Sequence, residues 1–178
     1  ADETISDELA NELRTTIESE TPYQAFRVYR RNYYLGQKWP HIEKLERLFR
    51  VRSLKGWYGA VHESPSVEGE IGQLKGEIIH DTHRSLSQMV QKTLEWSKIE
   101  AQLRFDANHP RMSWWRFPKL MIGAFWNSYI TQQGWRVGTV GLIESMYQSF
   151  SIFITYARLW EMQHQPKADR PLDDIKSL

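Results

Sequence analysis

The spacing of apolar residues changes near residue 80, and this change most constrains the fold. From residue 25 to residue 80, aromatic and β-branched residues partly alternate with charged ones, which is typical of strands. From residue 85 onward, apolar residues recur every third or fourth position, which is typical of amphipathic helices. We therefore predict an α+β protein, in which a mixed sheet over about 25–80 follows one helix and precedes three more.

Capping and turn residues mark the ends of these elements. Ser6, followed by acidic residues, predicts a helix to about residue 18, and Ser85 predicts a second helix that ends near Pro110. Strands are predicted at 25–34, 44–52 and 57–62, and two more within 69–79, where Gly72 and Gly76 act as breaks. The segment 36–42 is predicted as a loop, and 114–130 and 138–163 as helices.

Charge and cysteine content exclude several classes of protein. The chain has no cysteine, which excludes a disulfide scaffold, thiolate zinc sites and cysteine nucleophiles. The net charge is only +1, but residues 1–22 carry a net −6 and residues 23–63 a net +6. With so little net charge and no aromatic platform motif, binding to single-stranded nucleic acid is not expected.

The last third of the chain is rich in tryptophan and in bases. Residues 111–165 hold five of the eight tryptophans, with five bases and two acids. Glu144, Gln148 and Arg158 interrupt the most apolar stretch, so we expect no membrane crossing. Tryptophans beside bases are typical of a segment that lies in a membrane interface. The alternative is that these aromatic residues pack the helices against the rest of the domain.

Several polar residues are candidates for catalysis or metal binding. Asp2 precedes the first helix, and His62 and Glu63 end a predicted strand, where catalytic groups are often found. His80 and His83 bracket Asp81 in a loop between a strand and a helix, a trio that suggests a metal. Taken singly, Asp2 is also explained as a first-turn acid, and His62 with Glu63 as a solvated turn. Three polar residues as close in sequence as the His-Asp-His trio rarely make a whole metal site.

The order of short motifs resembles the C-terminal half of family 2 glycosyltransferases that build lipopolysaccharide core and related surface glycans. The resemblance covers about residues 1–163. It rests on these segments: Ala1-Asp2-Glu3, Ser6-Asp7-Glu8-Leu9, Asn32 to Gly36, Lys44 to Arg50, Val61-His62-Glu63, Gly72 to His80, Arg84 to Ser87, and Tyr156 to Glu161. The run Arg47-Leu48-Phe49-Arg50 and the Val-His-Glu triplet are its most specific parts.

The resemblance implies the acceptor-side part of a GT-A fold. It implies an inverting transferase that moves a sugar from a nucleotide sugar to a lipopolysaccharide-core or other surface glycan or glycolipid. The nucleotide-binding strands and the first acid of the Asp-x-Asp motif have no counterpart in this sequence, where Asp2 matches the last acid of that motif. We therefore expect the chain to lack the donor-binding half and to be inactive by itself.

The resemblance also implies roles for the candidate residues. Asp2 and His80 would hold a divalent metal, Mg or Mn, that offsets charge on the leaving diphosphate. Glu63 would be the general base for the acceptor hydroxyl, and only the motif separates it from Asp81 in this role.

Three further residues would assist binding. Arg47 or Arg50 would bind phosphate, and His62 would support substrate binding from beside the base.

These expectations give a division of the chain and a location. Residues 1–110 are predicted to be the acceptor-side part of the glycosyltransferase domain, 111–165 Trp-rich amphipathic helices, and 166–178 a loose tail. The protein is expected in the cytoplasm, at the inner face of the cytoplasmic membrane, where an anionic surface would bind it. The alternative function is a membrane-surface or protein-interaction module without catalysis.

Overall fold

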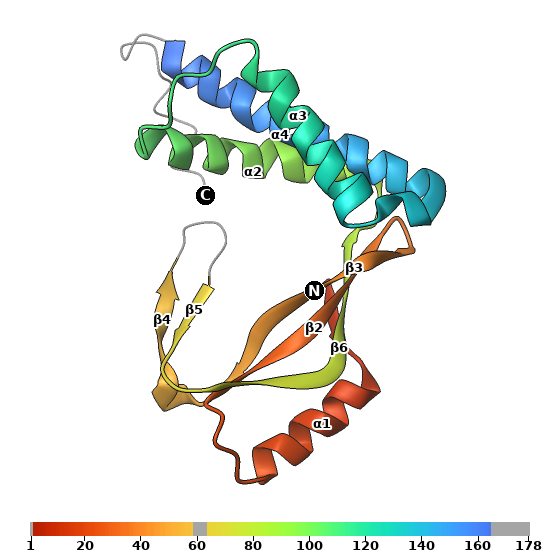
Figure 1. Cartoon of the computed structure of the whole chain (residues 1–178), viewed down its shortest axis with the longest axis vertical. Coiled ribbons are helices and arrows are strands. Elements are labelled where there is room, and N and C mark those ends of the chain that lie inside the picture. Colours follow the sequence, from red (N-terminus) through yellow and green to blue (C-terminus); the bar gives the residue numbers. More distant parts are fainter. Residues whose placement is uncertain (1, 59–63, 165–178) are drawn as a thin grey trace.

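The computed structural model describes residues 2–58 and 64–164, which form a sheet with helices at its two ends (Figure 1). The strands are β1 (Glu3–Ile5), β2 (Ala25–Tyr34), β3 (Gln37–Phe49), β4 (Leu54–Tyr58), β5 (Ser64–Val67) and β6 (Ile71–His83). The helices are α1 (Asp7–Glu18), α2 (Leu86–Asp106), α3 (Arg116–Trp126) and α4 (Gly138–His164), with short turns η1 (Val51–Ser53), η2 (Asn127–Thr131) and η3 (Gly134–Val137). The helices α2, α3 and α4 gather at one end of the molecule, and α1 lies at the other.

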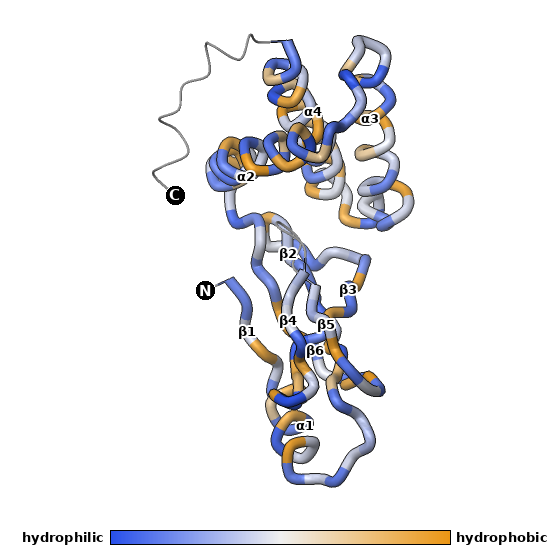
Figure 2. Tube along the Cα trace, turned by 90° about the vertical axis from the view of Figure 1, so that its left-hand side faces the viewer, coloured by the Kyte–Doolittle hydropathy of each residue, from blue (hydrophilic) through white to orange (hydrophobic). Residues whose placement is uncertain are grey.

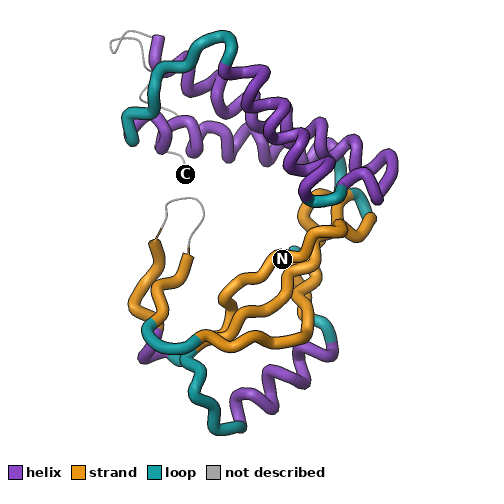
Figure 3. Tube along the Cα trace, viewed as in Figure 1, coloured by secondary structure: helices purple, strands orange, loops and turns teal. Residues whose placement is uncertain are grey.

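Four strands form a mixed sheet in the order β1-β6-β2-β3. The central strands β2 and β6 are parallel, and each pairs antiparallel with an edge strand. Leu35 and Gly36 join β2 to β3 in a two-residue turn, and both have positive φ angles, as tight hairpin turns require. The hairpin of β4 and β5 stands apart from this sheet (Figure 3).

The segment predicted as a loop at 36–42 is instead the first half of β3. This segment contains Gly36 and Pro40, and neither residue type favours a central strand. In the structure β3 is an edge strand, and the register with β2 slips between Ile42 and Lys38, so that three residues of β3 bulge out. A bulge on an edge strand tolerates a proline, because no ladder hydrogen bond is lost there.

The two strands predicted within 69–79 are one strand, β6, with an irregularity at Gly76. The helix α1 crosses β6 so closely that a Cβ at Gly76 would lie 2.5 Å from the Cα of Leu9. Leu9 packs there against Val28 and Leu74. The glycine therefore marks a close approach of helix and strand, and the strand continues through it.

The three C-terminal helices form a layer of their own. Ser85 caps α2 by accepting a hydrogen bond from the backbone N–H of Gln88, as predicted. Near the far ends of the helices, Ala101, Met112 and Leu159 form a buried apolar cluster. Within residues 2–58 and 64–164, no helix combines the length and the apolar composition needed to cross a membrane.

Trp39 joins the sheet to the helical layer. The bulge in β3 carries this buried residue, whose Nε1–H donates to Oε1 of Gln132 at 2.9 Å. Its ring packs edge-on against Tyr34, and a Cβ at Gly134 would lie 2.7 Å from its Cη2 atom. The indole therefore fills the space inside the turn between α3 and α4.

The structure has the mixed sheet followed by three helices that the periodicity predicts for an α+β protein. The predicted helices at 6–18, from 85 and at 138–163 are confirmed. The division at residue 110 and the GT-A assignment stay predictions.

Replacing Trp39 by alanine is expected to lower the free energy of unfolding by about 3–5 kcal/mol, since it empties a large buried site. Urea denaturation would measure the loss. Trp114→Ala, at a side chain that is 82% exposed, is the matched control and should change the stability by about 0.5 kcal/mol or less. Equal effects of the two substitutions would contradict the role given to Trp39.

Candidate functional site

A chain of polar contacts crosses the four-stranded sheet near its helical end. Asn32 on β2 lies beside His80 on β6, and its Oδ1 atom is 2.8 Å from Nδ1 of His80. On its other side, Nδ2 of Asn32 donates to Oε1 of Glu43 on β3 at 3.1 Å. Nε2 of His80 is 3.4 Å from Oδ2 of Asp2, which precedes β1. The chain of contacts therefore connects both edges of the sheet.

The buried amide of Asn32 determines which ring nitrogen of His80 donates to it. A carboxylate can only accept hydrogen bonds, so the amide NH2 must face Glu43. The amide oxygen then faces His80, and Nδ1 of His80 must carry a proton to donate to it. In a neutral imidazole the lone pair is consequently on Nε2, which points toward Asp2.

Asp2 is held in its ionised form. Burial raises its pKa, but hydrogen bonding to its own backbone N–H and the charge of His80 outweigh this and hold the pKa below 3.8. Its backbone carbonyl accepts from the N–H of Asp81, which ties this end of the chain to β6. Two potential metal-binding atoms, one oxygen and one nitrogen, thus lie side by side.

Arginines flank this chain of contacts on β2 and β3. Arg30 forms an ion pair with Glu43 and donates to Oε1 of Glu3 at 3.3 Å. The guanidinium of Arg47 lies 3.6 Å from the same carboxylate of Glu3 and is partly exposed. Arg47, predicted to bind phosphate, is therefore near Asp2 in space.

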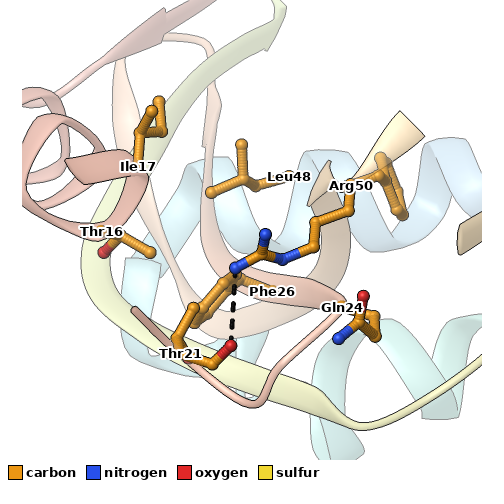
Figure 4. Close-up of a pocket in the computed structure, with 8 residues that line it drawn as sticks. Thr16, Ile17, Thr21, Gln24, Phe26, Leu48 and Arg50 are labelled. Carbon is orange, nitrogen blue, oxygen red and sulfur yellow. Dashed lines mark hydrogen bonds between the residues drawn. The ribbon is translucent and has the colours of Figure 1, made fainter. Parts of the chain in front are cut away.

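Arg50 lies at the opposite end of the sheet. Its guanidinium donates to the backbone carbonyl group of Tyr23 at 3.3 Å. It also donates to the carbonyl group of Thr21 at 3.4 Å (Figure 4). It borders a small cavity of about 190 Å³ between α1 and the ends of β2 and β3. Seven residues of β2, about 23 Å at 3.3 Å per residue, separate this end of the sheet from Asn32. Arg50 is therefore far from Asn32 and His80, and its guanidinium is bound to backbone carbonyl groups.

His62 and Glu63, the predicted base and its neighbour, lie outside the described residues. Their place in the chain is between β4 and β5. Asp81, the other candidate base, is half exposed and forms an ion pair with Arg84 at 3.1 Å. The structure brings Asp2 and His80 together, places Arg47 against the neighbouring Glu3, and places Arg50 against the carbonyl groups of Tyr23 and Thr21.

A polar cavity of about 390 Å³ lies where the sheet meets the helices. Its lining is rich in amide and carboxylate groups and also includes two aromatic rings. The residues are Tyr34, Trp39, Glu43, Ala124, Asn127, Ser128, Gln132, Glu144, Gln148 and Ile152. Glu43 belongs both to this lining and to the chain of contacts that reaches Asp2, so the two features are continuous.

Glu144 supplies the helical side of the cavity with a buried carboxylate. Only 1% of the residue is exposed, and its carboxylate contacts Nδ1 of His83 at 3.0 Å and accepts from Gln148 at 2.7 Å. Burial, together with Glu144 and Glu43, raises the pKa of Tyr34 far above its ordinary value, so its hydroxyl stays protonated.

The Asp2–His80 pair fits part of the coordination shell of a divalent ion. Two ligands about 2.1 Å from one cation and at right angles are about 3 Å apart, close to the observed separation. No group of three His, Asp or Glu side chains suited to a metal occurs in the described part of the chain. Mg²⁺ commonly takes one or two protein ligands and completes its shell with phosphate oxygens and water.

Sequence reasoning missed Asn32, Glu43 and Glu144 as parts of the site. Asn32 was visible in the motif from Asn32 to Gly36, but its role depends on the register of three strands. Glu144 carried a signal of its own, because an isolated carboxylate in an apolar helix must find a buried partner.

Comparison with known proteins relates the chain to the glycosyltransferases. The chain is similar to the lipopolysaccharide core biosynthesis glycosyltransferase LpsC of Rhizobium meliloti (strain 1021). The two are 26% identical over 186 aligned residues, which cover 99% of this chain and 67% of LpsC. No family model matches the chain. No solved structure matches it either.

Removing the imidazole of His80 should raise the pKa of Asp2, because the positive charge and the hydrogen bond that lower it are lost. With its pKa lowered in the folded protein, ionised Asp2 stabilises the fold above about pH 3.8, and this contribution is lost as the pH falls through the lowered pKa. Carboxyl-carbon NMR titration of His80→Ala would measure the change. His109→Ala, in the helical layer, is the control, and an unchanged Asp2 pKa in His80→Ala would contradict the assignment.

Proposed function

We propose that the protein is an inverting glycosyltransferase that transfers a sugar from a nucleotide sugar to a lipopolysaccharide-core or related surface glycan. The observation that carries the proposal is the similarity to LpsC, which extends over 99% of the chain. The pairing of Asp2 with His80, residues far apart in sequence, supports it by offering a place for a donor diphosphate and its metal.

In the proposed mechanism, Asp2 and His80 would hold a divalent cation, Mg or Mn. Such a cation would offset the charge that develops on the leaving diphosphate. The contact with Asn32 orients the pair for this role. Asn32 keeps the Nδ1 proton of His80 in place, so that Nε2 is the atom that would bind the metal. Arg47, partly exposed beside Glu3, would bind the diphosphate, whereas the guanidinium of Arg50 is held by the backbone carbonyl groups of Tyr23 and Thr21.

The acceptor would lose its hydroxyl proton to Glu63 as the hydroxyl attacks the sugar carbon opposite the leaving group. Asp81 is the second candidate, although its ion pair with Arg84 lowers its availability as a base. His62 would assist from beside Glu63.

The cavity between sheet and helices suits an acceptor glycan. Sugar hydroxyls both donate and accept hydrogen bonds, and the amides of Asn127, Gln132 and Gln148 offer both functions. The carboxylates of Glu43 and Glu144 accept further bonds, since each has about four lone-pair directions. We place one sugar unit of the acceptor in this cavity.

Glu63→Gln in the full-length protein should lower turnover by about 10²–10⁴-fold, the usual contribution of a general base. Transfer from a panel of nucleotide sugars to lipopolysaccharide core oligosaccharide would measure it. Asp2→Asn should raise the metal concentration needed for half-maximal rate, and His80→Ala should do so more mildly.

Glu68→Gln is the matched control, because Glu68 is exposed, follows β5 and pairs only with Lys55 among the described residues. It should leave turnover unchanged. Near wild-type turnover of Glu63→Gln would transfer the role of base to Asp81. If all three site variants are silent, the transferase assignment of this site is wrong, and a module without catalysis becomes the better description.

Asn127→Ala should raise the acceptor KM by about tenfold, the loss of roughly one hydrogen bond of about 1.4 kcal/mol, and leave the donor KM unchanged. Steady-state kinetics with each substrate varied in turn would test this. Asn11→Ala, in α1 and far from the cavity, is the control. Equal changes in both KM values would argue against acceptor binding in the cavity.

A further inference from the structure

The helical layer carries its large apolar side chains on the outside. Six of the eight tryptophans belong to residues 86–164, and all six are among the exposed hydrophobic residues. On α4, exposed large residues recur along one face; they are Leu142, Met146, Phe150, Phe153 and Trp160. On α3 and the turn after it, Ile122, Trp126 and Ile130 are exposed in the same way. Figure 2 shows these helices with hydrophobic positions spread along their length.

The interior of the same layer, on the side near the sheet, is built from small and polar residues. The buried stripe of α2 is Met89, Thr93, Ser97 and Ala101, and that of α4 is Gly141, Ser145 and Ser149. Hydrogen bonds join the helices there: the hydroxyl of Ser149 donates to the carbonyl oxygen of Met121 at 2.8 Å, and Ser145 to Ser128 at 3.0 Å.

This distribution is the reverse of that in a helical bundle surrounded by water, whose apolar stripe faces the core. Small residues spaced four apart, with hydroxyl bonds between helices and large apolar residues outward, are typical of helices packed in lipid. An ordinary apolar core is found where the end of α2, the first half of α3 and the second half of α4 meet, around Leu159 and Met112. The outward apolar residues of these helices can therefore be buried only by a lipid phase or by another protein.

The charge balance of residues 111–163 favours an anionic surface. Residues 111–163 contain five bases and two acids, and Glu144 is one of those acids. Glu144 is buried and contacts His83, so Glu161 is the acid that remains at the surface. Arg136 lies over the ring of Trp135, 5.8 Å from its centroid, an arrangement suited to the headgroup region.

We propose that α3 and α4 lie in the headgroup and upper acyl region of an anionic bilayer, with the exposed apolar residues of the two helices named above buried in lipid and no helix crossing. The Trp side chains would sit at headgroup depth and the bases would contact lipid phosphates. This position on the membrane does not depend on the transferase reaction, and it would hold equally for a module without catalysis.

Sedimentation with vesicles tests the proposal. The full-length protein should bind vesicles of equal parts phosphatidylglycerol and phosphatidylcholine at low salt, and be released by carbonate. The double variant Ile122→Glu/Met146→Glu places two charges among these apolar residues, at positions that are 65% and 57% exposed, and should weaken binding by about tenfold or more. Ile17→Glu/Val51→Glu, at residues 70% and 91% exposed outside the helical layer, adds the same charge and should bind within about twofold of wild type.

Quenching of tryptophan fluorescence by brominated lipids supplies a measurement that needs no variant. Strong quenching of the vesicle-bound wild-type protein supports this position on the membrane. Its absence, or equal binding by both double variants, overturns it. A wild-type protein that ignores vesicles but forms a dimer, which Ile122→Glu/Met146→Glu converts to a monomer, would show that a second copy covers these residues and would also overturn it. Retention after carbonate extraction would contradict a surface position.

Discussion

The amide of Asn32 can satisfy its hydrogen bonds in only one orientation, and the arrangement of the site depends on this constraint. Glu43 requires the NH2 group on its side, which leaves the amide oxygen for His80. His80 must then donate through Nδ1, which leaves Nε2 facing Asp2. Because Asn32 is buried in a central strand, an error in the pairing of β2 with β6 or β3 would leave a buried polar group without a partner, which is costly. The same contacts thus maintain both the register of the sheet and the chemistry at its edge.

The two layers meet through polar groups more than through apolar packing. The sheet contributes Glu43 and the helices contribute Glu144, and both carboxylates border one cavity. Trp39 supplies the large apolar contact at this junction, and the contact of His83 with Glu144 adds a charged one. A junction of this kind leaves room for a polar ligand between the layers. A junction packed with leucine and phenylalanine would have closed that space.

Local signals predicted the elements well, and long-range geometry accounts for what they missed. The caps at Ser6 and Ser85 and the change of periodicity identify four helices and a sheet, because these signals depend on neighbouring residues alone. The strand through Pro40 was not predictable, since a proline bulge depends on which strand is at the edge of the sheet. The continuity of β6 through Gly76 was not predictable either, since it depends on where α1 crosses the sheet.

The candidate site shows the same division. Asp2 and His80 were named from the sequence and lie 3.4 Å apart, but that proximity rests on the pairing of β1 with β6. The exposure of α2 residues such as Leu86, Val90 and Leu94 also escapes sequence reasoning, because helical spacing does not say which apolar stripe faces inward.

The strand β6 is continuous from the core beside α1 to the helical layer, and this continuity fixes the distance between the candidate site and that layer. From His80 to His83, where the sheet touches Glu144, the strand advances three residues, roughly 10 Å at 3.3 Å per residue. With the helices held in lipid, the strand would act as a rigid spacer that keeps the polar site at a constant height above the headgroups. An acceptor anchored in the same bilayer would then be selected by reach: a glycan shorter than this height could not bring its hydroxyl to the site, whatever its sugars.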